Sequence, residues 1–247
     1  MDGSDTEGAP AGGTSHRDGP MLFVDSLDDP VLSKDDYHHI SKVLREPDGV
    51  PIVLCDGAGS WRRASLAARP VTVGAVDMVP APSLRITVAF ALIKGDRPEL
   101  VVQKLTELGV DEIIPLNTDN GVVRWKGDRA AKQRERFERI AKEASMQCRR
   151  THLPIIGGVR SYEQLIEQTS TVIRCDVGGM RFAEAFDAVV HTRPDRVVLA
   201  VGPEGGWSER ERRFGGAVAA VGDHILRAET ASIAAATLAT AARSQRV

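Results

Sequence analysis

Cysteine is scarce in this sequence, and hydrophobic runs are short. The 247 residues include three cysteines, Cys55, Cys148 and Cys175, without the C-x-x-C spacing of many zinc sites. A disulfide framework would need a denser, even set, so we expect passive thiols, no metal site and a reducing cytoplasmic location. No apolar run approaches the roughly 20 residues of a membrane helix. Residues 1–20 lack the apolar stretch of a signal peptide, and we expect a disordered tail there.

The net charge of −2 gives no sign of nucleic-acid binding, but the charges are unevenly distributed. Residues 1–36 carry nine acidic side chains against Arg17 and Lys34, a balance of −7, so the remainder carries +5. Within that remainder, residues 124–150 contain ten Lys or Arg and four acidic residues. This stretch fits a phosphate-binding track. It fits equally well a solvated helix face with ion pairs such as Glu135–Arg139.

Two patterns of secondary structure follow each other along the chain. Residues 21–80 contain short apolar strands, a helix at 34–44 and a glycine-rich turn at 56–59, as in a small β-barrel. After a proline-containing linker, strands alternate with helices from residue 84 to 247. This alternation predicts an α/β domain with a parallel sheet covered on both faces. The expected strands are 84–92, 111–116, 171–175, 197–201 and 223–226, and the expected helices are 97–108, 130–147, 161–168, one after Ser208, and 232–243.

Residues 202–206, with the sequence GPEGG, follow the apolar strand at 197–201 and precede a helix signature. Glycines there let a ligand approach the backbone closely, and the free N–H groups of the new helix point to the same place. Ser208 and Glu211 have the spacing of a capping box. The pattern predicts a ligand-binding loop at the carboxyl end of a strand, with a tight connection that binds nothing as the alternative.

A second segment, ILRAETA at 225–231, ends another short apolar stretch and opens the last helix. Further motifs accompany the two segments: HISKVLR at 39–45, KGD at 94–96, QKLTELGV at 103–110 and QC at 147–148. With this ordered set the chain resembles, from about residue 21 to its end, a bacterial family that methylates N3 of a uridine in 16S ribosomal RNA. That family belongs to the SPOUT class of RNA methyltransferases, which use S-adenosyl-L-methionine.

The resemblance implies a fold that periodicity does not reveal. Knots are nearly absent from proteins, so an unknotted doubly wound sheet is the default expectation. The resembled class instead threads its C-terminal part, here about residues 171–247, into a trefoil knot. Its N-terminal part, here 21–80, is a PUA-like RNA-binding barrel. The resemblance also implies S-adenosyl-L-methionine as cofactor, 16S ribosomal RNA or the small ribosomal subunit as partner, and a homodimer.

The resemblance places the methyl donor among three loops, which are residues 176–179 and the two segments around 202–206 and 226–231. The chemistry adds a requirement, because N3 of uracil carries a proton that must leave before or during attack. We expect Arg227 to stabilise the uracil anion and Glu229 to accept the proton, with a phosphate clamp and a helix cap as their respective alternatives. The residues expected to bind the cofactor are Gly178, Leu199, Gly202, Pro203, Glu204, Gly205, Gly206, Leu226, Ala228, Thr230 and Ala231.

Basic residues outside these loops are candidates for RNA contacts. Some stand at family-like positions, and others extend the basic stretch. For His39, a partly buried side chain that makes its hydrogen bonds within the fold is an equally good interpretation. The expected RNA-binding residues are His39, Arg45, Lys94, Arg124, Arg149 and Arg150.

The chain departs from the family pattern at three places, one of which is a missing arginine before the first strand, where Gly19 and Pro20 precede Met21. Residues 146–150 read MQCRR where the family commonly has EQCGR, and Ala228 stands where a threonine is common. The departures at Met146 and Arg149 motivate an alternative function, an RNA-binding ribosome-assembly factor that has the same fold and no transfer activity. A dinucleotide-dependent oxidoreductase has little support, because the G-x-G-x-x-G fingerprint is absent.

Overall fold

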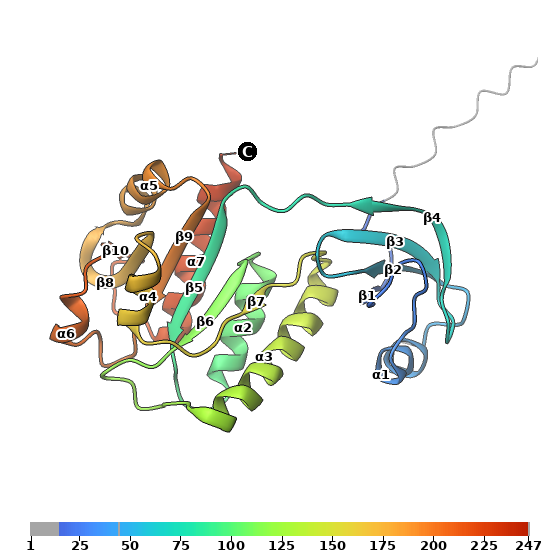
Figure 1. Ribbon diagram of the computed structural model, residues 1–247, viewed down its shortest axis with the longest axis horizontal. Helices are drawn as coiled ribbons and strands as arrows, with labels where there is room; N and C mark the ends of the chain where they lie inside the picture. Colours follow the sequence, from blue (N-terminus) through green and yellow to red (C-terminus); the bar gives the residue numbers. More distant parts are fainter. Residues whose placement is uncertain (1–14, 44, 247) are drawn as a thin grey trace, which may run out of the picture. The chain divides into compact units, whose positions relative to one another are not determined.

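The computed structural model describes residues 15–43 and 45–246, which form two compact units (Figure 1). One unit comprises the chain up to Asp56 together with Ser60–Val79. The other comprises Gly57–Gly59 and the chain from Pro80 onward. Within the described residues, no helix combines the length and the apolar character that crossing a bilayer requires.

The first unit is built on a four-stranded sheet with the order β1-β2-β3-β4. The predicted turn at 56–59 joins β2 to β3 as an antiparallel hairpin, with Cys55 opposite Trp61. β4 continues antiparallel to β3, whereas β1 pairs with β2 in parallel. The elements are β1 (Met21–Phe23), α1 (Lys34–His38), a π-helical segment η1 (His39–Val43), β2 (Pro51–Cys55), β3 (Ser60–Ser65) and β4 (Val71–Met78).

Part of the segment expected to be a disordered tail packs against β2. The carbonyl oxygen of Pro20 accepts a hydrogen bond from the backbone N–H of Val53 at 2.8 Å. Gly19 has a φ of +100°, and a Cβ at this position would lie 2.8 Å from the carbonyl oxygen of Pro51. Gly19 and Pro20 therefore do not belong to the predicted disordered tail, because their backbone packs on the sheet. Residues 1–14 of the predicted tail lie outside the described residues.

The second unit contains a six-stranded, fully parallel sheet with the order β10-β8-β9-β5-β6-β7. Strands and helices alternate along the chain, as the sequence predicts. The strands are β5 (Arg85–Ala91), β6 (Glu112–Leu116), β7 (Ile155–Ile156), β8 (Val172–Arg181), β9 (Arg196–Val201) and β10 (Ala217–Ala220). The helices are α2 (Arg97–Glu107), α3 (Gly127–Cys148), α4 (Tyr162–Gln168), α5 (Phe182–Thr192), α6 (Glu209–Arg212) and α7 (Ala228–Ser244).

Both faces of this sheet are buried, because side chains of each strand alternate between two apolar clusters. Val88 and Leu199 belong to the larger cluster, which they share with residues of α2, α3, α5 and α7. Ala89 and Val198 belong to the smaller cluster, which contains Tyr162 of α4 and Trp207. The predicted α/β class with a doubly covered parallel sheet is confirmed. Strand pairing alone does not define how the chain is threaded, so the knot stays a prediction.

Two strands were misplaced by sequence patterns. β8 extends to Arg181 and so includes residues 176–179, where we expected a loop. Gly179 lets β10 pack directly against this part of β8, because a Cβ there would lie 2.7 Å from the backbone of Ala219. The strand expected at 223–226 lies instead at Ala217–Ala220. Residues 221–227 form a loop, and the side chain of Ile225 is exposed rather than packed in the sheet. The helix α5 and the short strand β7 had no sequence expectation.

Candidate active site

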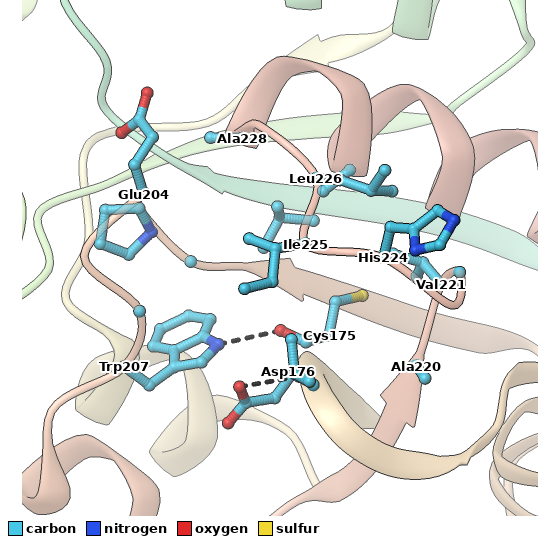
Figure 2. Close-up of a pocket in the computed structure, with 17 residues that line it drawn as sticks. Cys175, Asp176, Glu204, Trp207, Ala220, Val221, His224, Ile225, Leu226 and Ala228 are labelled. Atoms are coloured by element: carbon cyan, nitrogen blue, oxygen red, sulfur yellow. Dashed lines mark hydrogen bonds between the residues drawn. The ribbon is translucent and has the colours of Figure 1, made fainter.

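A pocket lies where β9 and β10 end, beside the middle of β8 (Figure 2). It is shallow, about 120 Å³ in volume, so a larger ligand would extend over Ile225, whose side chain is 84% exposed. The carboxyl ends of parallel strands are the usual ligand edge of an open α/β sheet. Its lining residues are Cys175, Asp176, Val177, Val201, Gly202, Pro203, Glu204, Gly206, Trp207, Ala220, Val221, Gly222, His224, Ile225, Leu226, Ala228 and Ala231.

Trp207 forms a rigid wall of this pocket. Its indole is only 4% exposed and donates a hydrogen bond from Nε1 to the carbonyl oxygen of Cys175 at 3.0 Å (Figure 2). The ring also packs on Tyr162, with 4.7 Å between centroids. Gly202 faces the indole so closely that a Cβ would lie 2.9 Å from the ring. A glycine at position 202 is therefore required by close approach.

We expect Gly202→Ala to weaken binding of S-adenosyl-L-methionine, the cofactor expected from the sequence, about 10- to 100-fold. The added methyl group must displace either the held indole or the glycine loop, and both line the pocket. Titration calorimetry measures the effect. Gly158→Ala is the matched control, because a Cβ at Gly158 meets nothing within 4 Å. Equal affinities of the two variants would show that the Gly202 contact does not shape the binding site.

The loop at 117–121 holds the glycine loop in place. Nδ2 of Asn120 donates hydrogen bonds to the carbonyl oxygens of Gly205 and Gly206 at 3.2 and 3.1 Å. Beside it, the carboxylate of Asp119 accepts two hydrogen bonds from Arg210, at 2.9 and 3.0 Å. No sequence pattern indicated this contact, because the two loops are more than 80 positions apart.

The helix that follows the glycine loop starts as the sequence predicts. Ser208 accepts a hydrogen bond from the backbone N–H of Glu211 at 3.1 Å, and Glu211 accepts one from that of Ser208 at 2.9 Å. This is the reciprocal capping box. Glu211 also accepts from the backbone N–H of Asp119 at 2.9 Å, so the cap itself contributes to the loop contact.

Hydrogen bonds from Arg210 and Ser208 hold the pKa of Asp119 at about 2, below its usual value of 3.8. The pKa is depressed in the folded state, so the stabilisation is full above about pH 4 and is lost as the pH falls towards 2. We therefore expect Asp119→Asn to lower stability by a constant amount between pH 5 and 8, with the difference from the unaltered chain shrinking below about pH 4. Asp119 is partly exposed, so the difference should be modest. Urea unfolding at a series of pH values measures it, and a difference that grows on acidification would contradict the assignment.

Glu229 lies in the first turn of α7 with an unsatisfied oxygen. Its side chain is 13% exposed, and among the described residues its Oε2 is buried without a hydrogen-bond partner. Nη1 of Arg97 lies 3.7 Å from Oε1 of Glu229 and also 3.7 Å from Oε1 of Glu204. Glu229 does not itself line the pocket, but it directly follows Ala228, which does. Leaving a buried carboxylate oxygen unpaired is costly, so such an atom suits a proton donor supplied by a substrate.

Arg227 occupies the N-cap position of α7 and is exposed. Its carbonyl oxygen accepts from the backbone N–H of Ala231 at 2.8 Å, and its side chain makes no capping hydrogen bond. The guanidinium has no recorded hydrogen bond or ion pair within the described part of the chain. Arg227 itself does not line the pocket, but its neighbours Leu226 and Ala228 do, so this cation lies close enough to meet an anionic ligand.

Most of the cofactor-binding residues expected from the sequence line the pocket, and four do not. Gly178 lies within β8, and Leu199 is fully buried in the sheet. Gly205 faces Asn120 instead of the cavity, and Thr230 is exposed on α7. The seven expected residues that do line it are Gly202, Pro203, Glu204, Gly206, Leu226, Ala228 and Ala231.

Several lining residues were missed by sequence reasoning. Trp207 could have been found, because it directly follows the glycine loop and a buried indole needs a hydrogen-bond partner. Asp176 and Val177 stood in a segment that we expected to bind the donor, although we named only Gly178 there. Val221, His224 and Ile225 carry no motif that would have indicated them.

The expected RNA-binding residues have different surroundings. Arg45 and Lys94 are exposed, and Arg45 has a φ of 58°. Arg149 is half-buried at the C-cap of α3 with a φ of 60°. Arg124 is exposed, but its Nη2 donates to the carbonyl oxygens of Thr118 and Asp119 in the loop that contacts the glycine loop. For His39 the side chain lies outside what the structure describes.

Arg150, also expected to contact RNA, makes its hydrogen bonds within the fold. Its guanidinium turns inward and donates to the carbonyl oxygens of Thr106 at 3.2 Å and Val110 at 2.7 Å, and to Asp111 at 3.3 Å. Burial lowers the pKa of Arg150, and the neighbouring Asp111 opposes that shift. Its donors are used within the fold, so phosphate would have to compete with a buried carboxylate.

The cysteines have the environment of packed thiols. Burial raises the pKa of Cys175 to about 12 and also raises that of Cys148. A thiol with a raised pKa is a poor nucleophile at neutral pH. Within residues 15–43 and 45–246, no group of three or more His, Cys, Asp or Glu is arranged to hold a metal ion.

Known proteins share this fold and much of this sequence. A family profile described as an RNA methyltransferase domain matches residues 80–240. The ribosomal RNA small subunit methyltransferase E of Bacillus subtilis is 30% identical over 221 residues, which cover 82% of this chain and 86% of that protein. The enzyme of the same name from Mycobacterium bovis is 30% identical over 87% of this chain and 88% of its own length.

A solved structure gives the same result. The crystal structure of a ribosomal RNA small subunit methyltransferase E from Neisseria gonorrhoeae, bound to S-adenosyl methionine, superposes with a TM-score of 0.76. The two proteins are 26% identical, and the match covers 89% of this chain and 96% of that one. The small N-terminal sheet and the six-stranded parallel sheet are thus shared with that structure. This chain belongs to the family of the ribosomal RNA small subunit methyltransferases E.

Proposed function

We propose that this chain transfers the methyl group of S-adenosyl-L-methionine to N3 of a uridine in 16S ribosomal RNA. The observation that carries the proposal is the position of Glu229, a nearly buried carboxylate with one unpartnered oxygen, at the start of the helix that borders the pocket. The gonococcal relative was solved with S-adenosyl methionine bound, which supports the choice of donor.

We place the donor in the pocket between the glycine loop and the loop that leads into α7. Gly202 and Gly206 allow close approach on one side. Leu226, Ala228 and Ala231 line the other side and offer backbone groups to the adenine. The first-turn N–H groups of α7 point into this region, as at other helix N-termini that bind polar ligands.

Transfer is an in-line displacement at the donor methyl carbon. The bond from carbon to sulfur breaks, a bond from carbon to N3 forms, and the sulfonium becomes a neutral thioether. The N3 proton moves to Glu229, whose Oε2 has no hydrogen-bond partner among the described residues. Arg227 stabilises the negative charge on the uracil oxygens while the proton leaves. Holding donor and acceptor in this geometry contributes much of the rate enhancement.

The RNA contacts and the assembly state complete the proposal. We assign residues 21–80 as a PUA-like RNA-binding unit, with Arg45 as an exposed cation, and residues 84–247 as the catalytic domain. Lys94, Arg124 and Arg149 are the remaining candidates for phosphate contacts. We further propose that the protein is a homodimer and is cytoplasmic. Sedimentation analysis would test the dimer directly.

The test is mass spectrometry of nucleosides from small ribosomal subunits incubated with the protein and S-adenosyl-L-methionine. The subunits come from cells that lack the endogenous activity. Appearance of 3-methyluridine supports the donor, the acceptor atom and the substrate class together. A methyl group on another atom would retain methyl transfer and overturn the assigned acceptor. No methylation of subunits or of naked RNA by the folded protein would reject the proposal.

A second candidate function is RNA binding during ribosome assembly without methyl transfer. It is favoured by the departures at Met146 and Arg149. Titration calorimetry separates the two functions, because an enzyme must bind S-adenosyl-L-methionine and a pure RNA binder has no need to. Micromolar donor affinity together with methyl transfer would eliminate this second candidate.

A further inference from the structure

Arg97 is the first residue of α2 and carries its charge at an unfavourable place. The N-terminus of a helix has a partial positive charge, so a cation there destabilises the helix. Two carboxylates from elsewhere in the chain offset this unfavourable interaction with the helix. Nη1 of Arg97 lies 3.7 Å from Oε1 of both Glu204 and Glu229. One guanidinium thus links the glycine loop to the first turn of α7, and helix stability does not explain its position.

Arg97 lines a second cavity beside the donor pocket. Glu204 lines the donor pocket, and it also lines a neighbouring hollow of about 490 Å³. The carboxylate of Glu204 points away from Trp207 (Figure 2). The hollow is lined by Lys94, Gly95, Asp96, Arg97, Val122 and Glu204. A residue in this place contacts the wall of the donor pocket from its outer side.

We propose that Arg97 is a positioning residue for methyl transfer, which holds Glu229 and the Glu204 loop in a fixed relation. The inference rests on the proposed function of Glu229 as proton acceptor. Oε1 of Glu229 lies 3.7 Å from Nη1 of Arg97, whereas Oε2 is buried and has no hydrogen-bond partner among the described residues. Without the guanidinium, Glu229 can rotate, and the two loops lose their common cation.

The interaction is suited to positioning rather than to stability. The side chain of Arg97 is 43% exposed, and both nitrogen–oxygen distances exceed that of a hydrogen bond. Exposed ion pairs contribute little to folding. Removing Arg97 should therefore leave the protein folded while altering the reaction.

The test measures transfer of labelled methyl groups to small-subunit RNA at saturating donor and RNA. We expect Arg97→Gln to lower kcat about 10- to 100-fold. Donor affinity should change less than about threefold, and Tm by less than about 2 °C. Arg97→Lys, which keeps the charge, should recover part of the rate. Lys104→Gln is the control: it removes another partly exposed cation of α2, paired with Glu107, and should leave kcat unchanged.

A double variant distinguishes action through Glu229 from an independent role. If Arg97 acts through Glu229, then Arg97→Gln combined with Glu229→Gln is no slower than Glu229→Gln alone. Losses that multiply in the double variant would overturn the proposal, as would an unchanged kcat of Arg97→Gln. The assay counts methyl groups on any atom, so an error in the acceptor atom leaves it intact. Absence of transfer by the unaltered chain would instead refute the proposed function.

Discussion

Arg227→Ala is expected to reduce methyl transfer at least about 100-fold while leaving affinity for S-adenosyl-L-methionine nearly unchanged. The guanidinium is exposed at the N-cap of α7 and makes no capping hydrogen bond. Its loss therefore removes no hydrogen bond or ion pair within residues 15–43 and 45–246, whereas the uracil anion loses the cation that stabilises its oxygens. An interaction made chiefly in the transition state affects kcat more than donor binding.

Single-turnover transfer and titration calorimetry, carried out on the same preparation, measure the two quantities. Arg193→Ala provides the control, because Arg193 is also exposed but precedes β9 at the opposite edge of the sheet from the glycine loop. Its transfer rate and donor affinity should match those of the unaltered chain. Collapse of donor affinity in Arg227→Ala would assign the residue a structural role in the donor pocket.

Asp111→Ala is expected to lower the free energy of unfolding by about 3–5 kcal/mol. The carboxylate of Asp111 is almost completely buried. It accepts from Arg243 at 2.7 Å, from Arg150 at 3.3 Å and from the backbone N–H of Ile86 at 2.9 Å. Removing it leaves two largely buried guanidinium groups facing each other, and the neighbouring carbonyl oxygens cannot neutralise them.

Urea unfolding followed by tryptophan fluorescence measures this loss, because Trp125 and Trp207 both lie in the second unit. The free energy of unfolding of Asp111→Asn should lie between those of the unaltered chain and Asp111→Ala, since an amide oxygen can still accept a hydrogen bond from the backbone N–H of Ile86. Glu138→Ala is the control, because it breaks an exposed pair with Arg134 and should cost no more than about 0.5 kcal/mol. A similar cost for Asp111→Ala and Glu138→Ala would refute the buried ion-pair interpretation.

Local chemistry accounts for what the sequence could predict. The glycine loop and the Ser208–Glu211 capping box depend on residues a few positions apart, and both lie where they were expected. The helix at 130–147 followed from apolar spacing, and α3 indeed covers it. These features need no knowledge of distant segments, which is why periodicity and motif spacing were sufficient.

Contacts between distant segments account for what the sequence missed. Nothing near Arg150 indicates that its guanidinium turns towards Asp111, 39 positions away. The extent of β8 depends on Gly179 lying against Ala219 of β10, and a glycine pair in isolation looks like a loop. Arg97 lies more than 100 positions from its two carboxylate partners. The residues that hold the site together were therefore the least predictable.

The contacts of Arg243 have a consequence for how the chain is made. Its guanidinium reaches Asp111, 132 positions earlier, and the carbonyl oxygen of Leu84, 159 positions earlier. At a synthesis rate of about 5–20 residues per second, Arg243 is added to the chain roughly 7 to 26 s after Asp111. During that interval the nascent domain lacks its final helix and exposes apolar strand surface. Elongation speed thus sets how long chaperones and proteases can reach the unfinished core.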